Sequence, residues 1–572
     1  MIAKMTQYSF LLLHGDKEDF LARLQELGVV DITRSSKPVD SYSQSLLDNI
    51  ETMRRDIACA EAGSDPTLQD LLARRDALLH EIAQATPWGE YDRERLAAFG
   101  GLHYYCVAAK KFDPAWAERY ALQVVEEQDG LVWFVIVGDA SGFPVKALPA
   151  PQHTPSELEP VLADLENKIE VHKEILKTRK DDIPAMEHHI RSLETELDRY
   201  LAGTAAVPAA EDTIDTLVGF APTENDAAVT AFLDSADVFY LKNKATVEEN
   251  PPIKFKNNKF VKMFEVLTDM YGRPAYDGFD PTPFIAVFFL LFFALCMGDA
   301  GYGLVLILVG LLLKKVPSFK DMAPLVVTLG GATVVVGFFL HTFFSIDIAQ
   351  WKCFEGIRWL FLPDEIAGYA GGMVLSLIIG VVHLCLAMVV KAVNTVRVNG
   401  FAASLGTLGW TLLIVGGVIV GGIALTGVLD AAVTKWIIIA LGVISAIGIF
   451  PLNDIKRNKL ANVGLGFWDT YQMVTGLLGD VLSYLRLYAL GLAGSMLGMA
   501  FNDMGKMILG DGSNIVLWIP FILLVLIGHT LNIAMCALGA FVHPLRLNFL
   551  EFFKNSGYEA AGRKFNPLTS NK

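Results

Sequence analysis

The chain has 572 residues and a formal net charge of -15, and 53% of its residues are hydrophobic while only 19% are charged. This composition is too apolar for a soluble protein of this length, and the acidic balance, without a Lys/Arg run, argues against a nucleic-acid partner. The six cysteines never fall in a CxxC spacing, so the sequence predicts no disulfide framework and no metal site.

Charged residues are concentrated in the first half of the chain. Residues 1–270 are rich in Asp, Glu, Lys and Arg, whereas residues 283–313 contain a single charged residue, Asp299. The N-terminal segment has no cleavage pattern of a secretory signal. We therefore expect a cytoplasmic domain at residues 1–265 and a membrane domain at residues 266–572.

Three stretches of the N-terminal half show the pattern strand, helix, strand. They run from QYSFLLLH to VVDITRS, from LHYYCVAAKK to GLVWFVIVGD, and from IDTLVGFAP to DVFYLKN. In the first stretch, Gly28 is placed to end the helix. We expect three small α/β modules.

Two long helical stretches lie between these modules. From Leu162 to Tyr200, mostly apolar residues alternate steps of three and four, which is a heptad seam. The earlier stretch carries apolar residues at helical spacing at Leu46, Ile50, Met53 and Ile57. We expect antiparallel coiled-coil arms that join the modules, with a kink at Pro184. A mechanical strut and an ordinary helical hairpin fit this pattern equally well.

From Pro283 onward, apolar stretches approach the length that a hydrocarbon core of about 30 Å requires. The sequence predicts an α-helical membrane domain with eight transmembrane helices, the last two long and tilted, at residues 283–297, 299–314, 323–346, 369–391, 403–427, 434–451, 467–502 and 515–550. The loops after the second, fourth and sixth spans hold most of the Lys and Arg residues. The positive-inside rule then places both termini in the cytoplasm.

Arg486 stands in the middle of the apolar stretch SYLRLYALGL at residues 483–492. A charged side chain at mid-membrane costs about 2.5–3.5 kcal/mol on insertion scales, so it should face protein or water, and it usually marks function. Small residues share its helix face and let another helix come close. The alternative is a structural arginine, hydrogen-bonded to a carbonyl or to Asp480.

Polar residues form a stripe along the predicted eighth helix. They follow steps of three and four at His529, Asn532, Cys536, Gly539, His543 and Arg546. A water-filled groove would need such a stripe, and polar contacts that hold helices together are the alternative. For Arg546, the alternative is a side chain that extends to the lipid headgroups.

No phosphate-binding loop and no dinucleotide fingerprint occurs in the sequence. We therefore expect no cofactor and no enzyme activity in the chain alone.

Several segments resemble one family: the large membrane stator subunit of rotary V-type and archaeal A-type ATPases, called subunit I in bacteria and subunit a in eukaryotes. Residues 251–283 are similar to the approach to the membrane in that family, and MGDAGYG is similar to its first membrane hairpin. SYLRLYALGLA resembles its seventh-span arginine motif. FVHPLRLNFLEFF with FNPL resembles its C-terminal signature, and LVGFAP resembles an element before the membrane.

The resemblance implies a stator that lies against a rotating ring of small membrane subunits, each with an ion-binding carboxylate. Arg486 would meet each carboxylate in turn, and Arg546 would be the second arginine. A nearby cation lowers a carboxyl pKa by roughly 1–3 units, and arginine itself stays protonated. By match to the family, the cytoplasmic half-channel would be lined by Asp480, Ser483, Tyr484, His543 and Glu551.

Some positions depart from the eukaryotic pattern. Gln472 and Cys536 replace glutamates, and Gly494 and Asn548 replace histidines. Gln472 stands at a position expected to line the opposite half-channel, and His529 and Asn532 are further half-channel candidates. These replacements leave the lining of the exit-side path open, and the ion is either a proton or sodium.

The implied partners are the ring, peripheral stalk subunits, central-stalk and ATP-hydrolysing subunits, and the lipid bilayer. The implied location is the inner membrane of a prokaryote. Two alternatives remain at this point: a self-contained secondary transporter with a regulatory cytoplasmic domain, and a purely structural membrane anchor.

Overall fold

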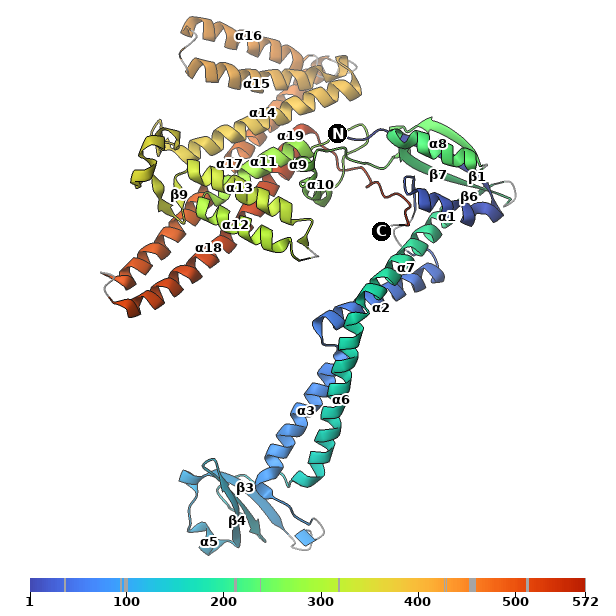
Figure 1. The fold of residues 1–572 in the computed structure, drawn as a ribbon. Helices are drawn as coiled ribbons and strands as arrows, with labels where there is room; N and C mark the ends of the chain where they lie inside the picture. Colours follow the sequence, from blue (N-terminus) through green and yellow to red (C-terminus); the bar gives the residue numbers. More distant parts are fainter. Residues whose placement is uncertain are drawn as a thin grey trace. The chain divides into compact units, whose positions relative to one another are not determined.

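The computed structural model divides the chain into two compact units (Figure 1). One consists of Met1–Leu11, Val29–Asp31 and Val218–Pro567, and the other of Leu12–Gly28, Ile32–Leu217 and Leu568–Lys572. The structure describes residues 1–34, 38–92, 95–96, 101–209, 213–236, 238–316, 319–425, 427, 430–451, 459–510 and 514–570. The two units are defined by contacts within the structure, whereas the predicted boundary at residue 265 separates soluble from membrane sequence. That boundary stays a prediction.

The first and third predicted modules are found as strands and helices. Strand β1, Met5–Leu13, alternates buried with less buried side chains and pairs antiparallel with β8, Phe239–Lys244, with Thr6 opposite Lys244. Their sheet has the order β2-β7-β1-β8, and β6 pairs with β7. The remaining elements are α1 (Lys17–Leu27), β2 (Asp31–Ile32), β6 (Val207–Ala209), β7 (Ile214–Pro222) and α8 (Asp226–Ser235). As predicted, Gly28 ends α1 in the left-handed conformation.

The glycine of LVGFAP has a packing role. A Cβ atom on Gly219 would lie 2.7 Å from Val30 Cγ1 and 3.1 Å from Phe10 Cε2. The sheet therefore accepts only glycine at this position without moving its neighbours.

Four helices of the other unit pack in pairs (Figure 1). Helix α2, Ser41–Ala62, packs on α7, Ile183–Thr204, and α3, Pro66–Ala85, packs on α6, Pro155–Asp181. The two contacts bury apolar residues at Leu46, Ile50, Ile190, Leu197 and Leu201, and at Leu68, Ile169 and Leu176. Instead of one kinked helix, the chain makes two, because α6 ends before Asp182 and Pro184 lies in the first turn of α7.

The middle module differs from its prediction. It is a three-stranded sheet in the order β3-β5-β4, with strands Leu102–Ala108, Leu131–Val137 and Leu122–Gln128. The predicted helix shrinks to α5, Trp116–Arg119. Strand β4 was not predicted from the sequence. It is largely exposed and carries Glu126 and Glu127, so it lacks the alternation of apolar and polar residues that marks a strand.

Asp215 of β7 is a buried carboxylate with two cationic partners. Its Oδ2 atom lies 2.9 Å from His14 Nδ1 and 3.0 Å from Lys17 Nζ. Burial raises the pKa of the Asp215 carboxyl, but the hydrogen bonds and charges of Lys17 and His14 outweigh that effect and lower it overall. A lowered pKa in the folded state stabilises the fold above the unfolded pKa of about 3.9, and this contribution is lost as the pH falls through the folded value.

We therefore expect Asp215→Asn to lower local stability by about 1–2 kcal/mol at pH 7. Hydrogen exchange of the α1 and β7 peptides in the full chain measures this loss. The difference between parent and variant should persist at pH 5 and shrink below about pH 4. A difference that is the same at every pH would contradict the assignment.

Eight apolar helices are found among the described residues of the second half of the chain. Five of them are long and apolar enough to cross a membrane, at Gly371–Asn399, Ala402–Leu425, Ala431–Ile449, Asn462–Leu509 and Ile515–Ser556. The other three are shorter, at α11 (Thr282–Met297), α12 (Ala300–Leu313) and α13 (Ala323–Phe339). The protein is thus a multi-pass membrane protein, and the count of eight spans stays a prediction.

The bounds of the long helices are α14 (Gly371–Asn399), α15 (Leu405–Leu425), α16 (Ala431–Ile449), α17 (Lys459–Leu509) and α18 (Trp518–Arg546). A π-helical turn, Leu547–Phe552, and α19, Phe553–Ser556, continue α18. Short helices α9 (Lys259–Lys262) and α10 (Glu265–Tyr271) precede α11, and short hairpins follow α13 at β9 (Thr342–Phe343), β10 (Ile346–Asp347), β11 (Glu365–Ile366) and β12 (Tyr369–Ala370).

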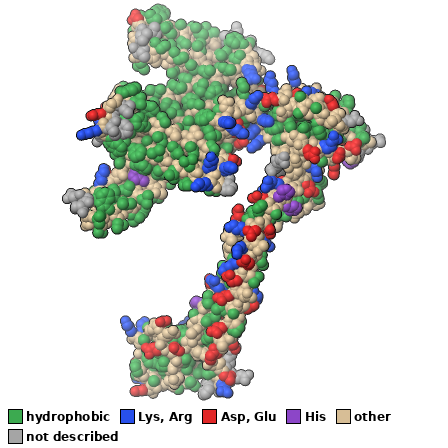
Figure 2. Space-filling model, in the orientation of Figure 1, with side chains coloured by type: hydrophobic (Ala, Val, Ile, Leu, Met, Phe, Trp, Pro, Cys, Tyr) green, Lys and Arg blue, Asp and Glu red, His purple; other side chains and the backbone are tan. Residues whose placement is uncertain are grey.

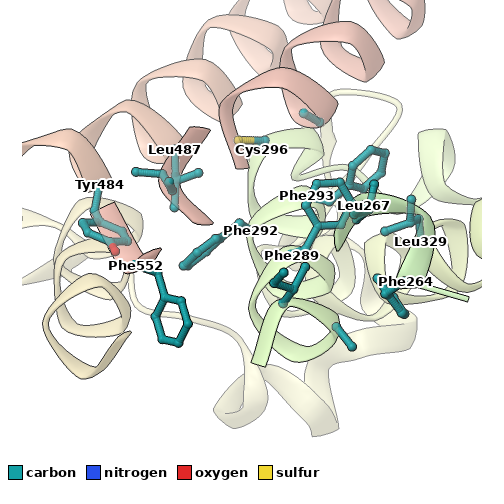
Figure 3. Close-up of a cluster of buried hydrophobic side chains, with 14 of the residues drawn as sticks. Phe264, Leu267, Phe289, Phe292, Phe293, Cys296, Leu329, Tyr484, Leu487 and Phe552 are labelled. Carbon is teal, nitrogen blue, oxygen red and sulfur yellow. The ribbon is translucent and has the colours of Figure 1, made fainter. Parts of the chain in front are cut away.

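Helix α11 lies in the centre of the membrane helices. Phe289 and Phe292 are fully buried, and they belong to one apolar cluster with Tyr484 and Leu487 of α17 and Phe552 (Figure 3). A helix that is apolar on every side is expected to be surrounded by other elements. The position of α17 is therefore set by a packed core and not by lipid alone.

A sharp joint connects α11 to α12. Gly298 ends α11 with a φ of 56°, and the Asp299 carboxylate caps α12 by accepting hydrogen bonds from the backbone N–H groups of Gly301 at 2.8 Å and Tyr302 at 3.2 Å. The same carboxylate accepts from the N–H groups of Phe344 at 2.8 Å and Ser345 at 2.5 Å. Asp299 thus fastens the turn after α13 to the joint.

Candidate functional site

Helix α17 turns Tyr484 toward α14 and Arg486 away from it. Tyr484 and Leu487 are fully buried, and the Tyr484 hydroxyl shares a hydrogen bond of 2.9 Å with His383 Nδ1 of α14. Any side chain at Gly380 would collide with the Tyr484 ring. Because two residues turn an α-helix by about 200°, Arg486 lies on the opposite side from this contact.

The His383–Tyr484 contact fixes the rotation of α17. The His383 ring lies between the rings of Phe288 and Phe552, with centroid distances of 4.1 and 4.7 Å. We expect His383→Leu to destabilise the chain by about 1–3 kcal/mol, since it leaves the buried Tyr484 hydroxyl without a partner. Thermal unfolding of the purified protein measures this loss. The double variant with Tyr484→Phe should lose less than the two single losses combined, and additive losses would contradict a direct contact.

Neither arginine has an ionic partner in the part of the chain that the structure describes. Within the described residues, Arg486 is half-buried, Arg546 is exposed, and neither side chain makes a hydrogen bond or an ion pair. His543 lies near enough to both guanidinium groups to be influenced by their charges. Asp480, the partner considered for a structural Arg486, is bonded elsewhere. The two cations therefore lie close to one another and are available to a partner outside this chain.

The arginines belong to an exposed apolar surface, which we call the arginine face. It is formed by large exposed side chains at helical spacing on α17 and α18, at Leu478, Leu482, Met496, Leu531, Met535, Leu538, Val542 and Leu550. Hydrophobic side chains likewise dominate the visible surface of these helices (Figure 2). Such a surface fits lipid or another membrane helix, and the cations make a purely lipid contact costly.

A carboxylate cluster lies where α17 meets the end of α18. Asp480 accepts hydrogen bonds from Lys554 Nζ at 3.2 Å and from Asn555 Nδ2 at 2.7 Å. Glu551, in the π-helical turn after Pro544, is buried, and its Oε2 atom has no hydrogen-bond partner among the described residues. Ser483, Asp480 and Arg546 all lie near the Glu551 carboxylate. The cluster offers two carboxylates, one of them with a free oxygen, beside the arginines.

His529 and Asn532 lie in a separate polar network. Tyr302 Oη is 2.8 Å from His529 Nδ1 and accepts a hydrogen bond of 2.8 Å from Asn532 Nδ2. His529 Nε2 is 3.0 Å from Asn502 Oδ1, and Asn532 also donates to the Gly494 carbonyl oxygen at 2.8 Å. The polar stripe is thus divided, because its first residues are hydrogen-bonded to α12 and α17 and its last residues join the arginines.

Gln472 is not brought into either group. Its side chain is exposed on α17, before Asp480, and the contacts described for the chain place no polar partner beside it. Conversely, the structure adds His383, Lys554 and Asn555 to the site. These residues carried no signal in the sequence, since their partners lie on other helices. Asp299 was visible as a lone charge in an apolar stretch, but its role was not.

The sequence is similar to that of known membrane subunits. The model of the V-type ATPase 116 kDa subunit family matches residues 147–321 and 469–570. A-type ATP synthase subunit I of Methanocaldococcus jannaschii is 30% identical over 477 residues, which are 76% of this chain and 65% of the relative. The corresponding subunit of Pyrococcus abyssi is 33% identical over 334 residues, 57% of this chain and 48% of the relative.

A third relative matches from end to end. V-type ATP synthase subunit I 1 of Treponema pallidum is 26% identical over 636 residues, covering 99% of this chain and 100% of the relative. The matched region spans less than two thirds of the length of each of the two archaeal relatives. Arg486 and Arg546 both lie inside the second segment of the family match.

Proposed function

Since the chain belongs to the V-type ATPase 116 kDa subunit family, we propose that it is the membrane stator subunit of a V-type or A-type rotary ATPase. In this role it forms the ion path against a rotating ring of small subunits with ion-binding carboxylates. Peripheral stalk subunits bind its cytoplasmic part. Central-stalk and ATP-hydrolysing subunits of the same complex carry out the ATP chemistry, and this chain does not.

The observation that carries the proposal is the unpaired Arg486 on the arginine face. A permanent cation on an apolar membrane helix is costly unless a counter-charge comes to it. The ring supplies one carboxylate after another, and each is ionised beside the arginine because the cation favours the charged form. Arginine cannot relay the proton itself, so it separates two aqueous routes. Arg546 is the second cation on this face.

The carboxylate cluster supports an aqueous route to one side of Arg486. In the proposal, Asp480, Ser483, Tyr484, Glu551 and His543 line the cytoplasmic half-channel. The free oxygen of Glu551 is the group that exchanges an ion with the ring site or with water. Gln472, His529 and Asn532 are proposed for the opposite route. There the hydrogen-bonded network around Tyr302 provides polar groups within apolar helices.

The topology completes the proposal. Eight membrane spans, the last two long and tilted, follow a cytoplasmic domain at residues 1–265, and both termini lie in the cytoplasm of a prokaryote. The three short helices α11–α13 count as spans because they are apolar and contribute side chains to the buried core. The paired helices α2–α7 and α3–α6 act as antiparallel coiled-coil arms toward the peripheral stalks.

Purification distinguishes this function from the two alternatives. Co-purification of a ring-forming small subunit with nucleotide-binding subunits is the expected result. A solitary protein with a bound solute would favour a secondary transporter. The α11–α12 joint does not support a solute site at Asp299, because backbone N–H groups already donate hydrogen bonds to its carboxylate. An assembled complex that hydrolyses ATP without moving ions in sealed vesicles would favour a structural anchor.

The vesicle experiment also identifies the ion. ATP-driven acidification of vesicles that is abolished by a protonophore indicates protons. Sodium-dependent ATPase activity with sodium uptake that a protonophore stimulates indicates sodium. Absence of both kinds of uptake in an assembled complex that hydrolyses ATP would contradict the proposed function.

A further inference from the structure

A cavity of about 980 Å³ opens where the N-terminal strand region meets the first membrane helix. Its walls come from Met1–Thr6, from Thr223 and Asp226, and from the end of β8 with the residues after it. Tyr276–Asp280, Pro283 in the first turn of α11 and Arg397 in the last turn of α14 complete the walls. In the proposed topology, the start of α11 and the end of α14 mark one edge of the membrane. The cavity therefore lies at the level of the lipid headgroups on that edge.

Among the lining residues of this cavity that form no ion pair with each other, cations outnumber carboxylates. Lys242 is paired with Asp226 at 3.0 Å, and the Met1 amino group is paired with Asp280 at 2.5 Å. Among the residues described there, Lys4, Lys244 and Arg397 have no ion pair, and Asp277 is the one carboxylate that remains. Three cations against one carboxylate leave a site that favours an anion.

Apolar surface adjoins the cavity on the membrane side. The helices that frame it carry large exposed apolar side chains close in sequence to its lining residues, at Val287 on α11 and at Val393 and Val398 on α14, followed by Phe401. A soluble anion would gain nothing from these side chains. An amphiphile with an anionic head and hydrocarbon tails would contact both the cations and the apolar surface.

We propose that this cavity binds the headgroup of an acidic phospholipid. Its phosphate contacts Lys4, Lys244 and Arg397, and its acyl chains lie along the exposed sides of α11 and α14. This inference goes beyond the proposed ion path, because none of its residues belongs to the arginine face or to the carboxylate cluster. Bound lipid would join the N-terminal strand region to the first membrane helix.

The test measures the lipid that the full complex retains in nanodiscs and after extraction, with phosphatidylglycerol and phosphatidylcholine as probes. The ratio of retained phosphatidylglycerol to phosphatidylcholine should fall about 100-fold in K4Q/K244Q/R397Q, since each cation near an anionic surface contributes roughly a factor of five. The matched control is K314Q/K315Q/K320Q, which removes three exposed lysines after α12. The control should retain the parent ratio.

Two further measurements distinguish lipid binding from misfolding and from binding of free phosphate. Asp277→Asn removes the remaining carboxylate and should raise the ratio, a gain that misfolding does not produce. Inorganic phosphate alone should not protect the chain against thermal unfolding. An unchanged ratio in K4Q/K244Q/R397Q, an equal fall in the control, a failure of Asp277→Asn to raise the ratio, or full protection by phosphate would each overturn the proposal.

Discussion

In sealed vesicles that contain the whole complex, Arg486→Ala is expected to abolish ATP-driven ion uptake while leaving the complex assembled. The reason is electrostatic. A carboxyl whose pKa is lowered by 1–3 units beside a cation releases its ion about 10–1000 times more readily, and alanine provides no such effect. The guanidinium makes no hydrogen bond or ion pair within the described residues, so its removal leaves no buried group of this chain without a partner.

Two variants serve as controls for this result. Arg486→Lys keeps the charge but not the planar guanidinium, and partial uptake is expected. Lys506→Ala removes another cation of α17, one that is exposed and paired with Asp503 at 3.3 Å, and uptake should stay at the parent level. Uptake at the parent rate in an assembled Arg486→Ala complex would refute the role assigned to the arginine.

Asp299→Ala is expected to prevent stable accumulation of the protein. The carboxylate is buried and accepts four backbone hydrogen bonds. Each buried donor left without a partner costs about 1–3 kcal/mol, and the total is a large share of the 5–15 kcal/mol that stabilises a typical protein. The variant also releases Phe344 and Ser345, whose φ angles of 47° and 57° are unfavourable for these residues. The amount of protein in membranes and its unfolding temperature measure the effect.

The controls separate charge from shape. Asp299→Asn keeps an acceptor at Oδ1, the oxygen that accepts three of the four hydrogen bonds. A smaller loss of stability is therefore expected. Asp503→Ala removes an exposed carboxylate of α17 and should leave the unfolding temperature unchanged. An Asp299→Ala protein that accumulates and unfolds like the parent would show that the joint does not depend on this carboxylate.

Properties set by neighbours in sequence were predictable here. Each predicted apolar segment contains an apolar helix, because hydropathy is a local property. Gly28 ends α1 because a left-handed residue is needed there. The unusual character of Arg486 was visible for the same reason, since an arginine between leucines contradicts its surroundings.

Properties set by distant contacts were not predictable. Asp299 finds two of its donors beyond α13, and His383 finds Tyr484 on another helix. The polar stripe looked continuous from spacing alone, but it is divided by Tyr302, which comes from α12 and captures His529 and Asn532. Within the site, the sequence therefore indicated residues of interest but not their partners.

The Asp299 joint also constrains how the chain can be made. Helices α11, α12 and α13 have 16, 14 and 17 residues, each fewer than the about 20 that span a bilayer unaided. Two donors for Asp299 lie 45 and 46 residues further along the chain. At about 5–20 residues per second, they leave the ribosome seconds after Asp299. We therefore expect the three helices to wait beside the insertion machinery and to enter the bilayer together as one pre-folded hairpin stack.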